Sequence, residues 1–205
     1  MTLARPLAAL MLAAGCLSKP SFDCPVAPGP AQTEPGIGST GGVPLGSADC
    51  GNRSLVGLGF TLTRETIPSQ RTVITATLRC ATVSYRGRYE TGATEDVQVP
   101  GGSEQAVDGP FFGDCPGGHV VTGLAAHLVG NGGRFNSVVV TCAALDLRGT
   151  PVGDVTEIPV IATGSETPQV SADCRADEEL HGFEATGGRE LDRVALRCTQ
   201  PTCKP

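Results

Sequence analysis

Nine cysteines are the residues most able to do covalent chemistry in this chain of 205 residues. Their number and even spread are typical of a disulfide framework formed in an oxidising compartment. A structural zinc site is the competing interpretation, but such a site uses Cys-x2-Cys pairs with histidine nearby, and the sequence contains no such pair. We therefore expect disulfides, and neither a metal site nor a cofactor.

The cysteines mark three copies of one arrangement of residues. Each copy begins with Asp-Cys, continues to a glycine that precedes an apolar residue, and ends in an apolar run that closes on a second cysteine. The copies are Asp49–Cys80, Asp114–Cys142 and Asp173–Cys198, and their opening cysteines lie 65 and 59 residues apart. A self-similar period of this length indicates a repeat architecture, so we expect three-fold internal symmetry.

Strands must position the two cysteines of each copy. In each closing run, the residues two and four before the cysteine are apolar, and those one and five before it are polar. This period of two predicts a strand with one buried face, which carries the cysteine. An opening strand precedes it, and a loop joins the two as an antiparallel hairpin. The closing runs are 74–80, 136–142 and 192–198; the opening strands are 54–62, 119–128 and 179–185; the loops are 67–69, 131–133 and 187–188.

The first and last residues of such a hairpin are neighbours at its open end. Disulfides are therefore expected across each copy, from Cys50 to Cys80, from Cys115 to Cys142 and from Cys174 to Cys198. Each closes a loop of about 25–30 residues, which is worth roughly 3–4 kcal/mol in the chain-entropy account. Cys24 and Cys203 remain, and pairing them would tie the two ends of the folded region together. Eight cysteines allow about 105 connectivities, so this scheme depends on the repeat geometry.

The first 15 residues have the pattern of an export signal peptide. One arginine precedes an apolar stretch that ends in small residues and is too short to span a bilayer. The junction Leu12–Cys16 resembles the lipobox of bacterial lipoproteins, in which the cysteine is lipidated and becomes the mature N-terminus. Lipidation of Cys16 leaves an even number of cysteines and would hold the protein stably at a bilayer. Ordinary signal cleavage, with Cys16 as an incidental thiol, is the alternative.

The rest of the chain is expected to form a tether and one folded domain. Residues 16–35 are rich in proline and should form a semi-extended tether. Residues 36–205 should form the three-repeat domain, with repeats at about 36–80, 81–142 and 143–203. The segments between the hairpins contain shorter alternating stretches, Glu95–Val99 and Glu157–Ile161, which supply the remaining strands.

A recurring aspartate precedes each opening cysteine. Asp49, Asp114 and Asp173 would be equivalent around a three-fold axis. An aspartate at a turn usually caps backbone N–H groups, and we expect this role here. An axial carboxylate cluster or a cation site is the alternative, and paired carboxylates could also serve glycoside hydrolysis.

The histidines give no catalytic pattern. His119, His127 and His181 fall at different offsets within their copies and accompany no nucleophile signature, so we expect structural roles for them. The Gly-Gly-Arg stretches at 132–134 and 187–189 join two strands, whereas a phosphate-binding loop joins a strand to a helix. We interpret both stretches as turns.

Aromatic residues, which stack on sugar rings, are scarce in this chain: it has 6 Phe, 2 Tyr and no Trp. Sugar sites combine such rings with Asp and Asn side chains that hydrogen-bond the hydroxyls. Tyr85 and Tyr89 are the best candidate pair for binding a sugar. The formal charge of −6 and the absence of a Lys/Arg run give nucleic-acid binding no support.

The stretch from Cys115 to Cys142 resembles the repeats of vitelline membrane outer layer protein I. It contains Cys-Pro-x-Gly, a strand ending in Gly-Leu, a glycine-rich turn, and an asparagine ahead of an apolar strand that closes on cysteine; Leu191–Cys198 repeats the second half. The resemblance covers roughly residues 36–203. It implies a β-prism of three four-stranded antiparallel sheets around a pseudo-three-fold axis, stapled by disulfides. The family carries tryptophan in the sheet before the cysteine, and Phe111 and Phe112 occupy this place once here.

These observations predict an exported, lipid-anchored, all-β protein of the bacterial cell envelope or outer surface. Its expected role is non-catalytic, structural or binding, with the lipid bilayer as a partner through acylated Cys16 and with polysaccharide or envelope proteins as further candidate partners. A lectin-like module for cell-surface polysaccharide is the alternative function, because β-prisms include lectins. A glycan-processing enzyme is the third, and it would need two carboxylates about 5–10 Å apart in a cleft.

Overall fold

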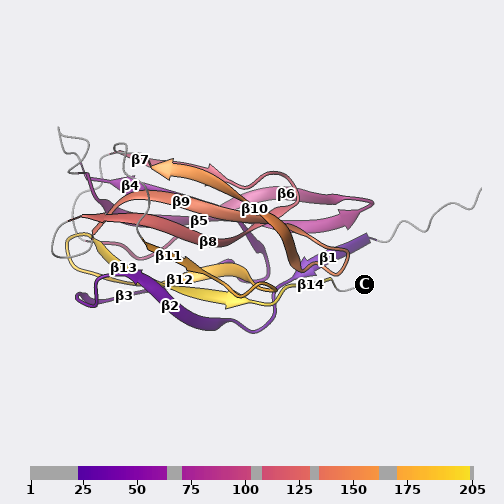
Figure 1. The fold of residues 1–205 in the computed structure, drawn as a ribbon, viewed down its shortest axis with the longest axis horizontal. Coiled ribbons are helices and arrows are strands. Elements are labelled where there is room, and N and C mark those ends of the chain that lie inside the picture. Colours follow the sequence, from indigo (N-terminus) through magenta and orange to yellow (C-terminus); the bar gives the residue numbers. More distant parts are fainter. Residues whose placement is uncertain (1–22, 64–70, 103–107, 130–133, 162–169, 204–205) are drawn as a thin grey trace, which may run out of the picture.

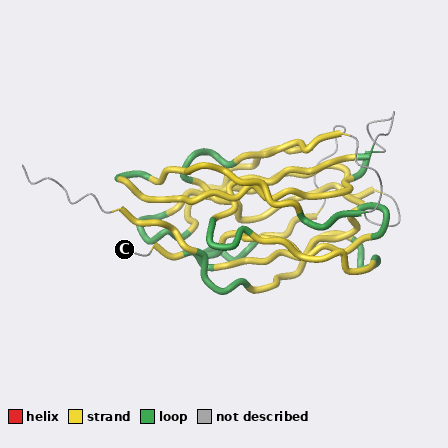
Figure 2. Tube along the Cα trace, turned by 180° about the vertical axis from the view of Figure 1, so that it is seen from behind, coloured by secondary structure: helices red, strands yellow, loops and turns green. Residues whose placement is uncertain are grey.

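The computed structural model describes residues 23–63, 71–102, 108–129, 134–161 and 170–203. These residues form only strands and loops, and the strands run along the long axis of the molecule (Figure 1, Figure 2). The predicted all-β class is therefore confirmed. No helix in the described part of the chain is long and apolar enough to cross a membrane. The signal peptide predicted for residues 1–15, and Cys16, lie outside the described residues.

Three hairpins form the centres of three antiparallel sheets. Each hairpin consists of one predicted opening strand and one predicted closing strand, and the observed bounds extend the predicted ones by a few residues. The hairpins are β4 (Ser54–Leu62) with β5 (Val73–Arg86), β8 (His119–Val129) with β9 (Arg134–Leu145), and β12 (Glu179–Gly187) with β13 (Leu191–Thr199).

One further strand pairs on each side of every hairpin. The first sheet has six strands, because β1 (Asp23–Ala27) and β14 (Thr202–Cys203) extend its four-stranded unit β6-β5-β4-β7. The second sheet has the order β10-β9-β8-β11, and the third β2-β13-β12-β3. These three four-stranded units are the predicted β-prism. The added strands are β2 (Gln32–Gly38), β3 (Val43–Asp49), β6 (Tyr89–Gln98), β7 (Asp108–Asp114), β10 (Pro151–Ile161) and β11 (Val170–Asp173).

The sheets do not follow the predicted repeat boundaries at residues 80 and 142. The first two sheets take the strands that follow their hairpins, up to Asp114 and Asp173. The sheet of the third hairpin is completed by β2 and β3, from the N-terminal region of the chain. Strands that lie far apart in the sequence therefore share the third sheet.

The tether predicted for residues 16–35 is wrong from Asp23 onward. Strand β1 (Asp23–Ala27) pairs with β5 and with β14 (Thr202–Cys203), and β2 begins at Gln32. Pro35 is tolerated within β2 because β2 lies at the edge of its sheet, where a missing N–H costs little.

The three sheets close around a shared apolar core. Strands β4, β8 and β12 contact one another about the axis, while the sheet edges meet as β7 with β10, β11 with β2 and β3 with β6. Alternate residues of the hairpins point inward, as the period of two predicts, and burying each large side chain is worth about 1.5–3 kcal/mol. Fully buried members include Leu58, Leu78, Leu124, Val140, Phe183 and Leu196.

Four disulfides link the strands in the predicted pairs. Cys50–Cys80, Cys115–Cys142 and Cys174–Cys198 each close the open end of one hairpin, and Cys24–Cys203 joins β1 to β14 near the two ends. Their Cα–Cα distances lie between 5.4 and 5.7 Å, which is normal for disulfides. The closing cysteines are buried in the core, on the face that the alternation assigns to them.

The carboxyl group of Glu179 is completely buried within this fold. Glu179, the first residue of β12, is 0% exposed, and neither of its carboxyl oxygens has a hydrogen-bond partner among the described residues. Burial raises its pKa to about 8, and the nearby Ser54 hydroxyl opposes this shift only in part. Glu179 is therefore protonated in the folded protein at neutral pH.

Glu179 makes the stability of the fold depend on pH. The pKa of Glu179 is higher in the folded protein than in the unfolded chain. The contribution of this group to the free energy of unfolding is therefore fully present below about pH 4.5 and is lost as the pH rises towards 8. Replacing Glu179 by Gln should remove this loss, because the amide does not ionise. In urea unfolding, the Glu179→Gln variant should be more stable than the parent at pH 8, with the gain shrinking towards pH 4.

The exposed Glu184, in the same strand, gives the matched control. Glu184→Gln should leave the pH dependence of unfolding unchanged. Equal pH profiles for the parent and Glu179→Gln would show that the Glu179 carboxyl is not the responsible group.

Candidate functional site

Each central hairpin carries a β-bulge immediately before a glycine, where the strand register shifts. The bulged residues are Val56, Thr122 and His181, followed by Gly57, Gly123 and Gly182. The amide of an opening cysteine donates a hydrogen bond to each bulged carbonyl: Cys115 to Val56 and Cys174 to Thr122 at 2.8 Å, and Cys50 to His181 at 3.1 Å. Each Asp-Cys pair therefore fastens the edge strand of one sheet just before the chain enters the next hairpin.

A row of four equivalent positions crosses each sheet at its bulge. The rows are Asp96, Arg79, Gly57, Asp114 in the first sheet; Glu157, Thr141, Gly123, Asp173 in the second; and Thr33, Arg197, Gly182, Asp49 in the third. Glycine is required at the third position because a Cβ there would collide with the aspartate or the backbone beside it. The aspartate side chain thus reaches across the glycine towards the second position.

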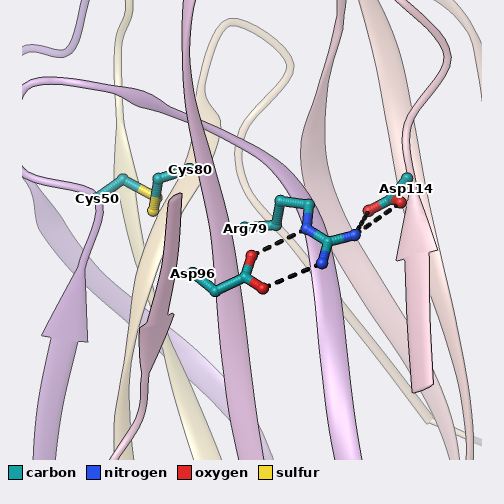
Figure 3. A network of polar contacts seen from close by, with 5 residues as sticks. All are labelled: Cys50, Arg79, Cys80, Asp96 and Asp114. Carbon is teal, nitrogen blue, oxygen red and sulfur yellow. Dashed lines mark hydrogen bonds and ion pairs between the residues drawn. A yellow bond between two sulfur atoms is a disulfide. The ribbon is translucent and has the colours of Figure 1, made fainter. Parts of the chain in front are cut away.

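In the first sheet, Arg79 occupies the space between two carboxylates (Figure 3). Its Nε and Nη2 donate to Asp96 at 2.9 and 3.0 Å, and its Nη1 donates to both oxygens of Asp114 at 3.1 and 2.9 Å. The guanidinium also lies 3.5 Å from the centroid of the Phe112 ring. The hydrogen bond from Arg79 lowers the pKa of Asp96, as expected for a bidentate pair.

The third sheet repeats part of this arrangement. Arg197 donates to Asp49, whose other oxygen accepts the Gly51 amide at 3.0 Å. The predicted capping role is therefore correct for Asp49, whereas Asp114 binds Arg79 instead. The alternative of an axial carboxylate cluster is wrong, because each aspartate faces outward from its own sheet while the following cysteine faces inward.

The second sheet keeps both carboxylates and lacks the arginine. Thr141 stands where the other sheets have Arg79 and Arg197. Ser171 stands where the first sheet has Phe112, since each lies two residues before its row aspartate. Small hydroxyl side chains thus replace the two side chains that fill the outer face of the first sheet, and a cavity of about 630 Å³ opens in their place.

Strand β10 builds one wall of this cavity. It departs from β9 between Val152 and Thr156, with Gly153 at a φ of +83°. Pro151, Val152 and Val155 present apolar surface to the cavity, and the two valines are 43% and 56% exposed. The volume suits a small ligand, which typically occupies about 300–1,000 Å³.

The carboxylates of Glu157 and Asp173 line the cavity without a cation between them. Burial raises the pKa of Asp173, and the negative charge of Glu157 raises it further. Neither carboxylate forms an ion pair within the described ranges, and the rim residue Arg175 binds Glu34 at 3.1 Å. The cavity therefore combines hydroxyls, an apolar wall and uncompensated negative charge.

The predicted tyrosine pair lies elsewhere, at the end of the β5–β6 hairpin. The rings of Tyr85 and Tyr89 meet edge to face, with centroids 5.2 Å apart and planes at 61°. Tyr89 packs against a small apolar cluster, and burial raises the pKa of its hydroxyl. Neither tyrosine lines the cavity of the second sheet. A role for this pair in binding stays a prediction.

The histidines are not brought together. His119 lies with Nδ1 3.3 Å from the Gly117 carbonyl, at the start of β8, and His181 is buried in β12, where burial lowers its pKa. Across the described ranges, no group of three or more His, Cys, Asp or Glu side chains could hold a metal ion. The Gly-Gly-Arg turn predicted at 132–134 falls largely outside those ranges.

The fold is shared with several solved structures. The agglutinin of Calystegia sepium is 15% identical, and the match covers 86% of this chain and 99% of that chain with a TM-score of 0.52. A Malaysian banana lectin is 16% identical, covering 82% and 97% with a TM-score of 0.48, and a single-chain recombinant jacalin is 12% identical, covering 83% and 95% with a TM-score of 0.38. No family model and no curated protein matches the chain, so the resemblance to vitelline membrane outer layer protein I stays a prediction. The fold itself is a β-prism, which the chain shares with the agglutinin of Calystegia sepium.

Restoring the missing arginine should fill the cavity. In the Thr141→Arg variant, the guanidinium would pair with Glu157 and Asp173 as Arg79 pairs with Asp96 and Asp114. We expect the free energy of unfolding to rise by about 0.5–1 kcal/mol at low salt, and by less at 1 M salt, because the pairs are near the surface. Denaturant unfolding at two salt concentrations measures both values.

Thr82→Arg is the matched control, since it adds the same charge at an exposed position of the first sheet. It should leave stability nearly unchanged. A Thr141→Arg protein that is less stable than the parent would contradict the equivalence of the three rows.

Proposed function

We propose that this protein is a non-catalytic carbohydrate-binding module whose site is the cavity on the outer face of the second sheet. The observation that carries the proposal is the lining of that cavity. Hydroxyls of Thr141 and Ser171 and carboxylates of Glu157 and Asp173 lie beside the apolar wall of β10. Sugars present hydroxyls around their edge and apolar C–H groups on their ring faces, so such a lining can bind both.

The shared fold supports this proposal by analogy. The structure from Calystegia sepium with the same β-prism is an agglutinin. Fold alone does not determine function, so the argument depends on the site. The other two sheets carry Arg79 and Arg197 at the position that Thr141 occupies in the second sheet. This difference distinguishes the outer face of the second sheet from the outer faces of the other two.

We further propose that the module is exported and held at a bacterial membrane through acylated Cys16. Four disulfides fit an oxidising compartment outside the cytoplasm. The first described strand begins at Asp23, so a lipid on Cys16 would lie close to the prism along the chain. A sugar site on an anchored prism would serve to bind cell-surface polysaccharide at the envelope.

Binding to a glycan panel tests the proposed site. The chain with Cys16→Ser should bind at least one oligosaccharide saturably, with a dissociation constant below about 1 mM. Adding Thr141→Arg should abolish this binding, because the arginine occupies the cavity, whereas Thr82→Arg should preserve it. Calorimetry on the three proteins gives the comparison.

Several outcomes would count against the proposal. Binding that survives Thr141→Arg but is lost in Tyr85→Ala or Tyr89→Ala would move the site to the tyrosine pair. Release of reducing ends from a bound oligosaccharide would make the protein an enzyme. The absence of binding across the panel would leave an envelope protein without a sugar ligand.

Membrane attachment is tested separately with the parent chain and its Cys16→Ser variant. In a bacterial host, the parent should label with radioactive palmitate and sediment with membranes, since several acyl chains on one residue anchor stably. The variant should do neither. Unlabelled parent protein in the soluble fraction would show that Cys16 is not lipidated and that ordinary signal cleavage applies.

A further inference from the structure

Deepening the proposed function, on which this inference rests, we infer that the sugar bound by the second sheet carries a positively charged amino group, which lies between Glu157 and Asp173. The chemical class is an amino sugar with a free amine. The argument depends on a comparison of the three sheets within one molecule.

The sister sheets show what these carboxylate positions bind. In the first sheet, the equivalent residues Asp96 and Asp114 hold one guanidinium through four hydrogen bonds of 2.9–3.1 Å. In the third sheet, Asp49 binds the guanidinium of Arg197. The same backbone positions therefore bind a nitrogen cation wherever the chain supplies one.

The second sheet keeps the acceptors and omits the cation. Glu157 lies opposite Thr141 as Asp96 lies opposite Arg79, and Asp173 lies across Gly123 as Asp114 lies across Gly57. Threonine is too short to replace the guanidinium, so the space between the carboxylates is part of the cavity. Each negative charge makes ionisation of the other carboxyl group less favourable. A cation placed between the two carboxylates would offset this repulsion.

The cationic side chain in the lining of the cavity binds a carboxylate elsewhere. Arg175 lines the cavity, but its guanidinium binds Glu34 on β2 at 3.1 Å. A ligand cation would therefore meet two carboxylates that have no ion-pair partner elsewhere in the described part of the chain. Charge-assisted hydrogen bonds of this type are about twice as strong as neutral ones.

The rest of the cavity indicates that the cation belongs to a sugar ring. A lone ammonium would need only the carboxylates, whereas this cavity extends to Ser171 and to the valines of β10. Hydroxyl groups beside Thr141 and Ser171, and C–H groups against Val152 and Val155, are features of a pyranose. An amine on such a ring would occupy the place that the Arg79 guanidinium takes in the first sheet.

Two oligosaccharides with the same backbone test the inference. The probes are the β-1,4-linked tetramer of glucosamine, with free amines, and its N-acetylated counterpart, which is neutral. The Cys16→Ser protein at pH 6 and low salt should bind the free amine at least tenfold more tightly. The difference should shrink in 0.5 M salt, and Asp173→Asn and Glu157→Gln should each bring the free-amine affinity close to that of the neutral tetramer.

Controls separate the site from general charge attraction. Thr141→Arg should abolish binding of the free-amine tetramer, while Thr82→Arg and Glu184→Gln, on other sheets, should preserve the preference. Equal affinity for the two tetramers, with loss of both in Thr141→Arg, would overturn this inference and leave the proposed function intact. A preference reduced equally by all substitutions would overturn it as non-specific attraction. Failure of every panel glycan to bind would overturn the proposed function as well.

Discussion

The same hydrogen bond fastens an edge strand in each of the three sheets, from the amide of an opening cysteine to the carbonyl of a bulged residue in the hairpin beside it. Consecutive residues of the edge strand face opposite sides of the sheet. The cysteine therefore points into the core, and the preceding aspartate faces outward. The disulfide then closes the next hairpin from the inside. Each Asp-Cys pair thus connects the core of the prism with its outer surface.

The glycine beside each bulge lets the aspartate lie across the outer face of the sheet. Because it has no Cβ, the aspartate lies directly over it and reaches the strand beyond. Two sheets use this approach for an ion pair with Arg79 or Arg197. The second sheet has the same backbone arrangement at Gly123, but its Asp173 forms no ion pair with any residue in the described ranges. A site can thus arise on a symmetric scaffold without any change in the core, because the varied positions all face outward.

Several features of the fold could be predicted from local patterns. Apolar Leu78, Val140 and Leu196 precede the closing cysteines by two residues, and this spacing placed both sets on the buried face. The segment that completes the third sheet could not be predicted in this way. Pro35 suggested a tether, whereas the need of the third hairpin for two further strands makes β2 and β3 its partners. That constraint is global, since it concerns closure of the whole prism.

The cavity escaped prediction for a different reason. Thr141, Arg79 and Arg197 each occupy the polar position before a closing cysteine. The alternation of apolar and polar residues does not distinguish the size or charge of these side chains. The significance of the threonine depends on Asp173 and Glu157, which lie on strands that no local pattern places beside it. The copies aligned on their closing cysteines show the threonine in place of arginine, although they do not show the carboxylates that surround the gap.

The most direct test of this account is nuclear magnetic resonance mapping of a bound oligosaccharide on the isotopically labelled Cys16→Ser protein. The account predicts that the backbone amides whose shifts change on titration cluster around Thr141, Ser171 and Asp173, with the equivalent positions at Arg79 and Arg197 unaffected. Shift changes centred on Tyr85 and Tyr89, or spread equally over the three sheets, would contradict it.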